Sequence, residues 1–346
     1  MKVLTAARVS ALILAPVLAL AALSGCSSAG SADGASTGAG STLAASTAAA
    51  DGPWSFTDDT GTTITLDHQP TKVASYSDYA IGLMSYGIDP VAIFGRVEVA
   101  TDDRFASYDL SNTAVVGNSY GEIDLEALAA AAPDVIVTGI YPTDREGTLD
   151  TTAAYYGFAD TEQQAQLEKI APVIAIEVGG KGMDVIASIN RLSEALGVSD
   201  ETVAAAKTTF DAAAADLTAA AAETKLEVTQ MYADADGIYV VKPADEPETE
   251  LYRSLGVNFT DLNPTGYYYW DIYSWENAAQ MMSGDVLLVN VEGYQAAELT
   301  GQPTFAAHPA LVASQAHTWN GAALDYASQA AHMTELTQIL RSSKAL

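Results

Sequence analysis

Residues 72–95, KVASYSDYAIGLMSYGIDPVAIFG, contain two short apolar runs on either side of a helical pattern that ends at Gly87. The runs, 72–75 and 91–94, are rich in β-branched and other apolar residues. Short uninterrupted apolar runs of this kind are typical of strands that are buried on both faces, as in a parallel sheet. The stretch therefore predicts a β-α-β unit.

The same alternation continues toward the C-terminus. We expect further buried strands at 114–117, 135–138 and 173–176, with helices at 125–132 and 162–170. Strands that alternate with helices form a mainly parallel sheet covered by helices. The sequence therefore predicts an N-terminal α/β lobe.

Residues 182–222 have a helical pattern only, broken at 197–200. Two consecutive helices fit this pattern. The second, alanine-rich helix over 200–222 would be roughly 35 Å long at the standard rise per residue. Its length suits a strut between two domains.

After this strut the α/β pattern resumes. Strands are expected at 227–232, 238–241, 258–262 and 286–291, and helices around 248–255, from residue 275 and over 329–340. The predicted fold class is therefore α/β, with two Rossmann-like lobes whose central sheets are joined by a long bridging α-helix. Such an arrangement creates a cleft between the lobes.

The N-terminus reads as a lipoprotein signal peptide. Lys2 and Arg8 precede an apolar run, 11–23, that is shorter than the ~20 residues needed to span a bilayer. It ends at the lipobox Leu23-Ser24-Gly25-Cys26, so Cys26 is the expected lipidation site rather than a buried core thiol.

The predicted boundaries follow from these patterns. They are a signal peptide at 1–25, Cys26 with a flexible Ser/Ala/Gly linker at 26–52, an N-terminal lobe at 53–180, a helical bridge at 181–224 and a C-terminal lobe at 225–346. Because Cys26 is the single cysteine of 346 residues, no disulfide is expected. The chain is expected to act as a monomer.

The chain is strongly acidic. It has 44 acidic and 15 basic residues, a formal net charge of −29 at pH 7. Nucleic acid is therefore an unfavourable partner, and the membrane is expected to be reached through the lipid anchor only.

Several ordered motifs resemble the siderophore, haem and cobalamin class of periplasmic binding proteins. The opening at 72–95 is followed by Val115-Val116-Gly117, then by 123–128 and 132–137, which are similar to the N-terminal core of that class. In the second half, the segments similar to its landmarks are Leu255-Gly256-Val257-Asn258, Trp275-Glu276, 285–289 and His308-Pro309.

The resemblance covers residues 54–342 and implies a class III binding protein of an ABC importer. It implies two lobes bridged by a stiff helix, limited closure on binding, and delivery to permease and ATPase subunits. It also implies that Glu126 and Glu276 are the lobe-tip residues that dock on the transporter. Taken without the resemblance, each would be an ordinary glutamate at a helix start.

Tyrosines follow most of the expected strands, where ligands of open α/β sheets bind. Flat aromatic groups give contact area to a large chelate, and phenols and guanidinium groups bind its oxygens. Tyr79 and Arg145 share such positions, and the predicted ligand-binding residues are Tyr76, Arg96, Tyr120, Tyr141, Tyr232, Tyr268, Trp270 and Tyr294. Packing in the protein interior is the alternative for each.

Two expectations are more specific. The run Tyr267 to Trp270 would alternate its faces if extended, so that two of the four would meet ligand. Arg96 is expected either in the cleft or in a surface ion pair, whereas an ion pair is favoured for Arg145.

Other functions have less support in the sequence. His68, His308, His317 and His332 are scattered, so no direct metal site is predicted, and His308 before Pro309 indicates a helix start. Asp234 to Gly237 is interpreted as a turn rather than a calcium loop. No motif of a hydrolase, phosphate loop or metalloprotease occurs, so no enzyme and no cofactor are predicted.

The ligand class follows from charge. A ferric siderophore of hydroxamate or mixed type is favoured over a trianionic tris-catecholate, because the chain has few basic residues to offer. Haem, which would need an axial Tyr or His, and cobalamin remain alternatives within the same class.

Overall fold

The computed structural model describes residues 52–321 and 323–346. The predicted signal peptide, Cys26 and the linker up to residue 51 lie outside this range. In the part of the chain that is described, no helix is both long and apolar enough to cross a membrane.

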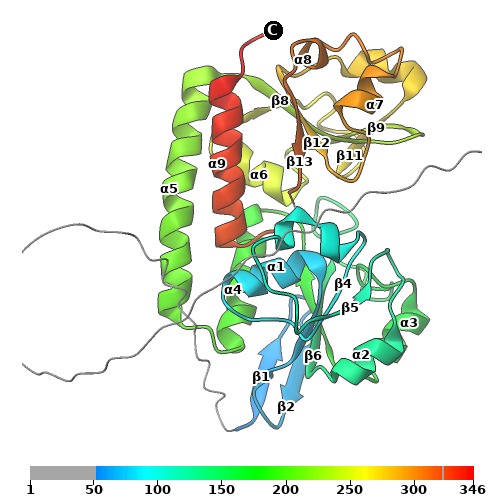
Figure 1. Ribbon diagram of the computed structural model, residues 1–346, viewed down its shortest axis with the longest axis vertical. Helices are drawn as coiled ribbons and strands as arrows, with labels where there is room; N and C mark the ends of the chain where they lie inside the picture. Colours follow the sequence, from blue (N-terminus) through cyan, green and yellow to red (C-terminus); the bar gives the residue numbers. More distant parts are fainter. Residues whose placement is uncertain (1–51, 322) are drawn as a thin grey trace, which may run out of the picture. The chain divides into compact units, whose positions relative to one another are not determined.

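The N-terminal lobe is built on a five-stranded parallel sheet, in which the predicted strands are confirmed (Figure 1). The spatial order is β5-β4-β3-β6-β7, so the order reverses at β3, which pairs with both β4 and β6. The strands are β3 (Val73–Tyr76), β4 (Ala92–Phe94), β5 (Ala114–Gly117), β6 (Val135–Ile140) and β7 (Val173–Glu177). Ligands of such sheets bind beyond the carboxyl ends at the reversal.

Short helices connect these strands. They are α1 (Ser77–Ser85), α2 (Leu125–Ala131) and α3 (Thr161–Leu167), with the 3₁₀ turns η1 (Val99–Thr101) and η2 (Asp103–Phe105). Asp124 and Asp160 accept hydrogen bonds from backbone N–H groups at the starts of α2 and α3, which satisfies donors that a helix start leaves unpaired. An antiparallel hairpin, β1 (Trp54–Thr57) and β2 (Thr63–Leu66), was not expected from the sequence.

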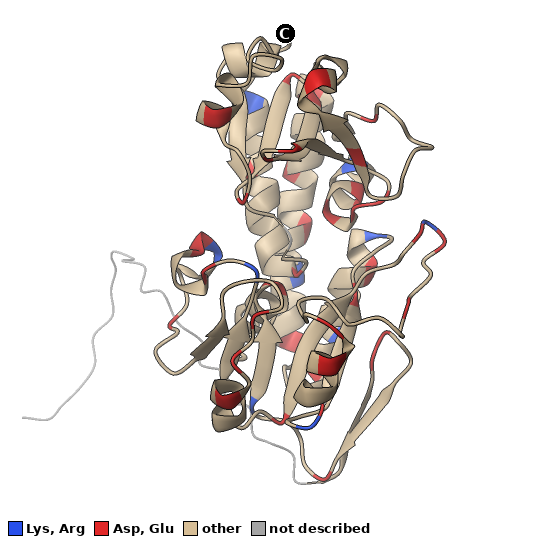
Figure 2. Cartoon of the chain, turned by 90° about the vertical axis from the view of Figure 1, so that its right-hand side faces the viewer, with Lys and Arg blue, Asp and Glu red and all other residues tan. Residues whose placement is uncertain are grey.

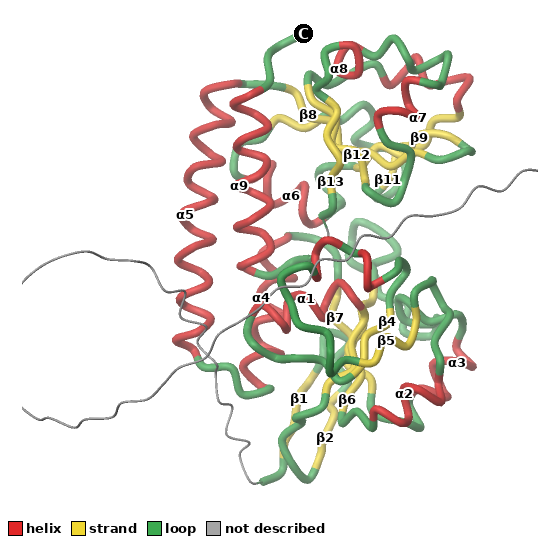
Figure 3. Tube along the Cα trace, viewed as in Figure 1, coloured by secondary structure: helices red, strands yellow, loops and turns green. Residues whose placement is uncertain are grey.

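The two-helix prediction for the middle of the chain is confirmed by α4 (Gly182–Ala195) and α5 (Asp200–Thr224). The 25-residue α5 lies beside the last helix, α9 (Tyr326–Ser342), as Figures 1 and 3 show. Phe210 packs on Tyr326 at 5.1 Å between ring centroids, and Arg341 pairs with Asp216 at 2.8 Å. The strut is therefore a pair of parallel helices rather than a single one.

The C-terminal lobe has a mixed sheet, in contrast to the parallel sheet of the N-terminal lobe. Its order is β11-β9-β8-β12-β13, with β10 beside β8, and β9 runs antiparallel to both β8 and β11. The tight turn at Asp234 returns the chain at once, which allows only an antiparallel partner. The strands are β8 (Glu227–Ala233), β9 (Gly237–Val241), β10 (Asn258–Phe259), β11 (Trp270–Ser274), β12 (Val286–Asn290) and β13 (Ala316–Trp319).

The helices of this lobe are short. They are α6 (Pro247–Ser254), α7 (Ala296–Thr300), α8 (Pro309–Val312) and the 3₁₀ helix η3 (Trp275–Met281), which stands where an α-helix was expected. The predicted role of His308 is confirmed, since its side chain accepts a hydrogen bond from the N–H of Ala310 at the start of α8. β11 and β13 were not predicted.

One apolar core includes residues of the N-terminal sheet, of α5 and α9, and of one face of the C-terminal sheet. It joins residues such as Ile136 and Leu217 to Val228 and Leu336 in a single buried cluster. Because the packed helices contribute to the core on both sides, the two lobes are held by burial as well as by the chain connections.

Candidate functional site

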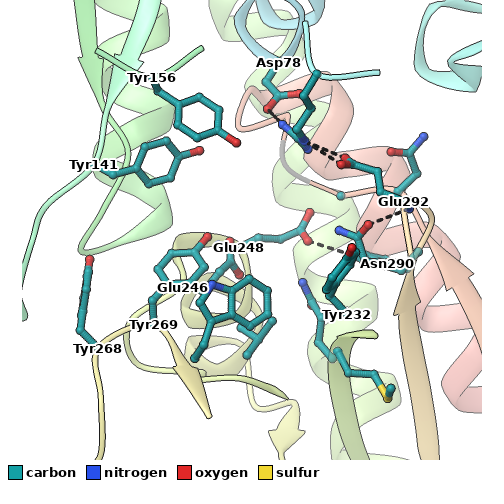
Figure 4. Close-up of a pocket in the computed structure, with 18 of the residues that line it drawn as sticks. Asp78, Tyr141, Tyr156, Tyr232, Glu246, Glu248, Tyr268, Tyr269, Asn290 and Glu292 are labelled. Carbon is teal, nitrogen blue, oxygen red and sulfur yellow. Dashed lines mark hydrogen bonds and ion pairs between the residues drawn. The ribbon is translucent and has the colours of Figure 1, made fainter. Parts of the chain in front are cut away.

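The carboxyl ends of the strands of both lobes line a cavity of about 500 Å³ (Figure 4). This volume falls in the range of small-molecule sites in proteins. Its lining residues are Asp78, Arg96, Tyr141, Pro142, Tyr156, Gln230, Met231, Tyr232, Val241, Glu246, Glu248, Tyr268, Tyr269, Trp270, Asn290, Glu292, Trp319, Asn320 and Gly321. The loops that follow the strands bring these residues together from positions far apart in the sequence.

The N-lobe wall, which we define as Asp78, Arg96, Tyr141 and Tyr156, rests on packed aromatic rings. Tyr156 lies 4.7 Å from Tyr141 and 5.3 Å from Tyr76 between ring centroids. Gly157 supports this arrangement, because it has φ +85° and a Cβ there would come within 2.5 Å of the Tyr76 ring. The wall is thus a fixed aromatic surface.

Asp78 is the charged centre of the N-lobe wall. Its two carboxylate oxygens accept hydrogen bonds from Arg96 at 2.7 Å and from Arg104 at 2.6 Å, and Arg104 also pairs with Asp102. Burial alone would raise the pKa of Asp78, but the two guanidinium charges outweigh it and the pKa lies below its ordinary value. Asp78 therefore stays ionised and holds Arg96 in place.

The second partner of Arg96 comes from the opposite lobe. Its Nε donates to both carboxylate oxygens of Glu292, at 2.7 and 3.0 Å. Arg96 thus lines the cavity, and its ion pairs lie in the cavity rather than on the surface.

The C-lobe wall, which we define as Tyr232, Glu246, Glu248, Tyr269 and Trp270, carries two buried carboxylates. Glu246 caps α6 and accepts from the N–H groups of Glu248 and Thr249, with no basic side chain as a partner in the described structure. Burial, followed by the charge of Glu248, raises the pKa of Glu246 to about 7.

Glu248 has a different setting. It accepts hydrogen bonds from Trp319, Gln329 and His332 at 2.9–3.1 Å. Burial alone would raise its pKa, but the hydrogen bond and charge of His332 bring the pKa of Glu248 below its ordinary value. Figure 4 shows both glutamates beside Tyr269 on the same side of the cavity.

The aromatic run does not alternate as expected. Tyr269 has φ +71°, so the chain turns there, and three consecutive residues, Tyr268 to Trp270, line the cavity. Tyr267 is 85% exposed and lies outside the lining. An extended strand would have sent neighbours to opposite faces, and the left-handed residue removes that constraint.

The predicted ligand-binding residues fall into two groups. The lining contains Arg96, Tyr141, Tyr232, Tyr268 and Trp270. Tyr76 is fully buried behind Tyr156, Tyr120 is 52% exposed and contacts the outer edge of Tyr156, and Tyr294 stacks on Trp275. In this structure these three contact neighbouring rings and are outside the cavity lining.

Arg145 forms the predicted ion pair, at 2.7 Å from Asp245 of the other lobe, and neither residue lines the cavity. Glu126 at the start of α2 and Glu276 in η3 are both exposed, one on each lobe. The turn at Asp234 is confirmed by its hydrogen bonds to the N–H groups of Asp236 and Gly237. In the described residues, no group of three or more His, Cys, Asp or Glu is placed to hold a metal ion.

Sequence reasoning did not find several lining residues. Asp78 lies two residues after the end of β3. It would have been predicted if carboxylates, as well as aromatic residues and arginines, had been considered at the strand ends. Glu246 and Glu248 read as ordinary helix-start residues, and Trp319 follows a strand that was not predicted. No local signal marks Tyr156, which comes from a loop.

Comparison with known proteins fits this geometry. The profile of the family described as periplasmic binding protein matches residues 73–320. The ferric-siderophore receptor protein DesE of Streptomyces coelicolor shares 28% identity at a TM-score of 0.72, covering 84% of this chain and 99% of that chain. No curated protein matches the chain.

Two more distant structures share the fold. A siderophore periplasmic binding protein from the fuscachelin gene cluster of Thermobifida fusca has 21% identity and a TM-score of 0.58, covering 79% of this chain and 97% of that chain. PiaA of Streptococcus pneumoniae, solved with ferrichrome, has 16% identity and a TM-score of 0.53, covering 83% and 97%.

Proposed function

Because this chain belongs to the periplasmic binding protein family, we propose that it captures a ferric siderophore in the cavity between its lobes. Members of this family are binding proteins, and the solved relative of 28% identity is a ferric-siderophore receptor. We propose a chelate of hydroxamate or mixed type that is neutral or cationic.

The observation that carries this proposal is the combination of aromatic walls with an acidic lining. Tyrosines and Trp270 offer flat contact area on both sides of the cavity. Of the described lining residues, four are carboxylates and one, Arg96, is basic, and Arg96 is already paired. A trianionic chelate would find no unpaired cation there, whereas a neutral or cationic one would avoid that repulsion.

The loaded protein would deliver the chelate to the permease and ATPase subunits of an ABC importer. Glu126 and Glu276, both exposed and on different lobes, are proposed to contact basic residues of the permease. Cys26 would hold the protein to the outer face of the cell membrane through its lipid. Figure 2 shows acidic positions along the ribbon of both lobes and fewer basic ones, which disfavours direct binding to anionic lipid heads.

The test is a titration of residues 52–346 with ferric chelates, followed by tryptophan fluorescence, since Trp270 and Trp319 line the cavity. Saturable quenching by a ferric tris-hydroxamate is the expected result. Saturation by haem or cobalamin, with no response to any ferric siderophore, would overturn the ligand assignment while leaving the importer role.

A further inference from the structure

We propose that Glu292 sets the charge selectivity of the site, because it occupies Arg96 from the opposite lobe and so denies that cation to anionic chelates. This inference rests on the proposed function, since it concerns which ferric chelates the cavity accepts. It assigns a selective role to one carboxylate among the four that line the cavity.

The two partners of Arg96 differ in how firmly they are held. Asp78 is almost fully buried, is fixed by a second arginine, and lies on the same lobe as Arg96. Glu292 has a side chain that is 25% exposed, and it follows β12 on the other lobe (Figure 4). Asp78 is therefore the permanent partner, and Glu292 is the one that a ligand would displace.

An oxygen of the ligand that binds Nε of Arg96 must take the place of the Glu292 carboxylate, and one that binds Nη2 must lie beside that carboxylate. A neutral chelate can do so while Glu292 turns toward solvent or receives a cationic group of the ligand. An anionic chelate would instead meet the displaced Glu292 at short range, and like charges in a partly desolvated site repel strongly.

No other basic residue of the described site relieves this repulsion. Arg104 lies behind Asp78 and is paired with Asp78 and Asp102, and it is outside the cavity lining. His332 is hydrogen-bonded to Glu248 and also lies outside the lining. Whether Glu292 keeps or releases Arg96 therefore determines whether an anionic chelate can form an ion pair in the cavity.

The experiment compares three ferric chelates with octahedral oxygen coordination and different net charge. They are a neutral cyclic tris-hydroxamate, a linear tris-hydroxamate with one ammonium group, and a trianionic tris-catecholate. Kd is measured by fluorescence for the wild type and for Glu292→Gln, which keeps the size of the side chain and removes its charge.

Glu292→Gln is expected to bind the tris-catecholate about tenfold or more tightly than the wild type does, whereas Kd for the neutral chelate changes less than about threefold. Glu292→Ala, which removes the whole carboxylate, should also bind the tris-catecholate more tightly than the wild type does. Thermal melting of each variant checks that it is folded.

Asp216→Asn is the matched control. It also removes one carboxylate from an ion pair with an arginine, at 2.8 Å from Arg341, and neither partner lines the cavity. This control should leave the ratio of the Kd for the tris-catecholate to the Kd for the neutral chelate as in the wild type. A similar gain for the tris-catecholate in Asp216→Asn would reduce the effect to net charge and overturn the role of Glu292.

The remaining outcomes separate the two proposals. If the wild type binds the neutral chelate and Glu292→Gln leaves the ratio of the Kd for the tris-catecholate to the Kd for the neutral chelate unchanged, the inference is wrong and the proposed function stands. If the wild type binds none of the three chelates, the proposed function fails, and the inference fails with it.

Discussion

The N-lobe wall of the cleft holds its buried carboxylate between two arginines, whereas the C-lobe wall holds two buried carboxylates with a single histidine. Asp78 therefore has its charge fully compensated, and Glu246 is compensated only by backbone N–H groups and a hydroxyl. We therefore interpret the N-lobe wall as preorganised and expect the C-lobe wall to respond to pH and to ligand charge.

The largest expected effect is on the N-lobe wall. Asp78→Asn would leave Arg96 and Arg104 without their shared buried partner, and breaking a buried pair in this way costs about 3–5 kcal/mol of unfolding free energy. Urea denaturation measures this loss. Glu246→Gln, a matched change on the C-lobe wall, should cost far less, and equal losses would contradict the comparison.

The next effect concerns ligand contact on the C-lobe wall. Trp270→Ala removes a large aromatic face from the cavity, and we expect the affinity for a ferric tris-hydroxamate to fall about tenfold to a hundredfold. Isothermal titration measures this without relying on the lost fluorophore. Tyr267→Ala, three residues earlier and exposed, should change the affinity little, so an equal loss there would place the ligand outside the cavity.

A smaller effect is expected from the pair of His332 and Glu248. Burial alone would lower the pKa of His332, but Glu248 reverses this, and the pKa lies above its ordinary value of 6.5. The stabilising charge is therefore fully present below pH 6.5 and is lost as pH rises through the raised pKa.

The variant His332→Gln tests this. It should lower the unfolding free energy by about 1–2 kcal/mol near pH 6 and by less near pH 9, as measured by urea denaturation at both values. A difference from the wild type that does not change with pH would show that His332 acts through packing alone.

The smallest effect is a pH dependence of ligand binding. The ionisable groups that face Glu246 are Glu248, whose pKa lies below its ordinary value, and Tyr252 and Tyr269, whose pKa values burial raises well above the ordinary value. Among these facing groups, Glu246, with a pKa of about 7, is the one that titrates near neutrality.

Affinity for a ferric chelate with one ammonium group should therefore rise about fivefold as pH increases through 7. Glu246→Gln should remove most of this rise, and the neutral cyclic chelate should show little of it in either protein. Kd measured at pH 6 and pH 8 decides the matter, and an unchanged slope in the variant would assign the titration to another group.

The sequence by itself determined most elements of the two lobes, apart from β1, β2, β11 and β13, and indicated a cleft between the lobes. Apolar runs such as 135–138 and the helical pattern of α5 reflect local burial and local propensity, which can be read along the chain. Since ligands of α/β sheets bind beyond strand ends, tyrosines such as Tyr141 and Tyr232 could be placed before the structure was known.

Only the tertiary structure decided which charges meet. Arg96 and Glu292 are 196 residues apart, and Glu248 and His332 are 84 apart. No periodicity links such residues, because their pairing depends on how two lobes and two helices pack. The left-handed turn at Tyr269, which brings three aromatic residues to one cavity, is likewise set by the surrounding fold rather than by local preference.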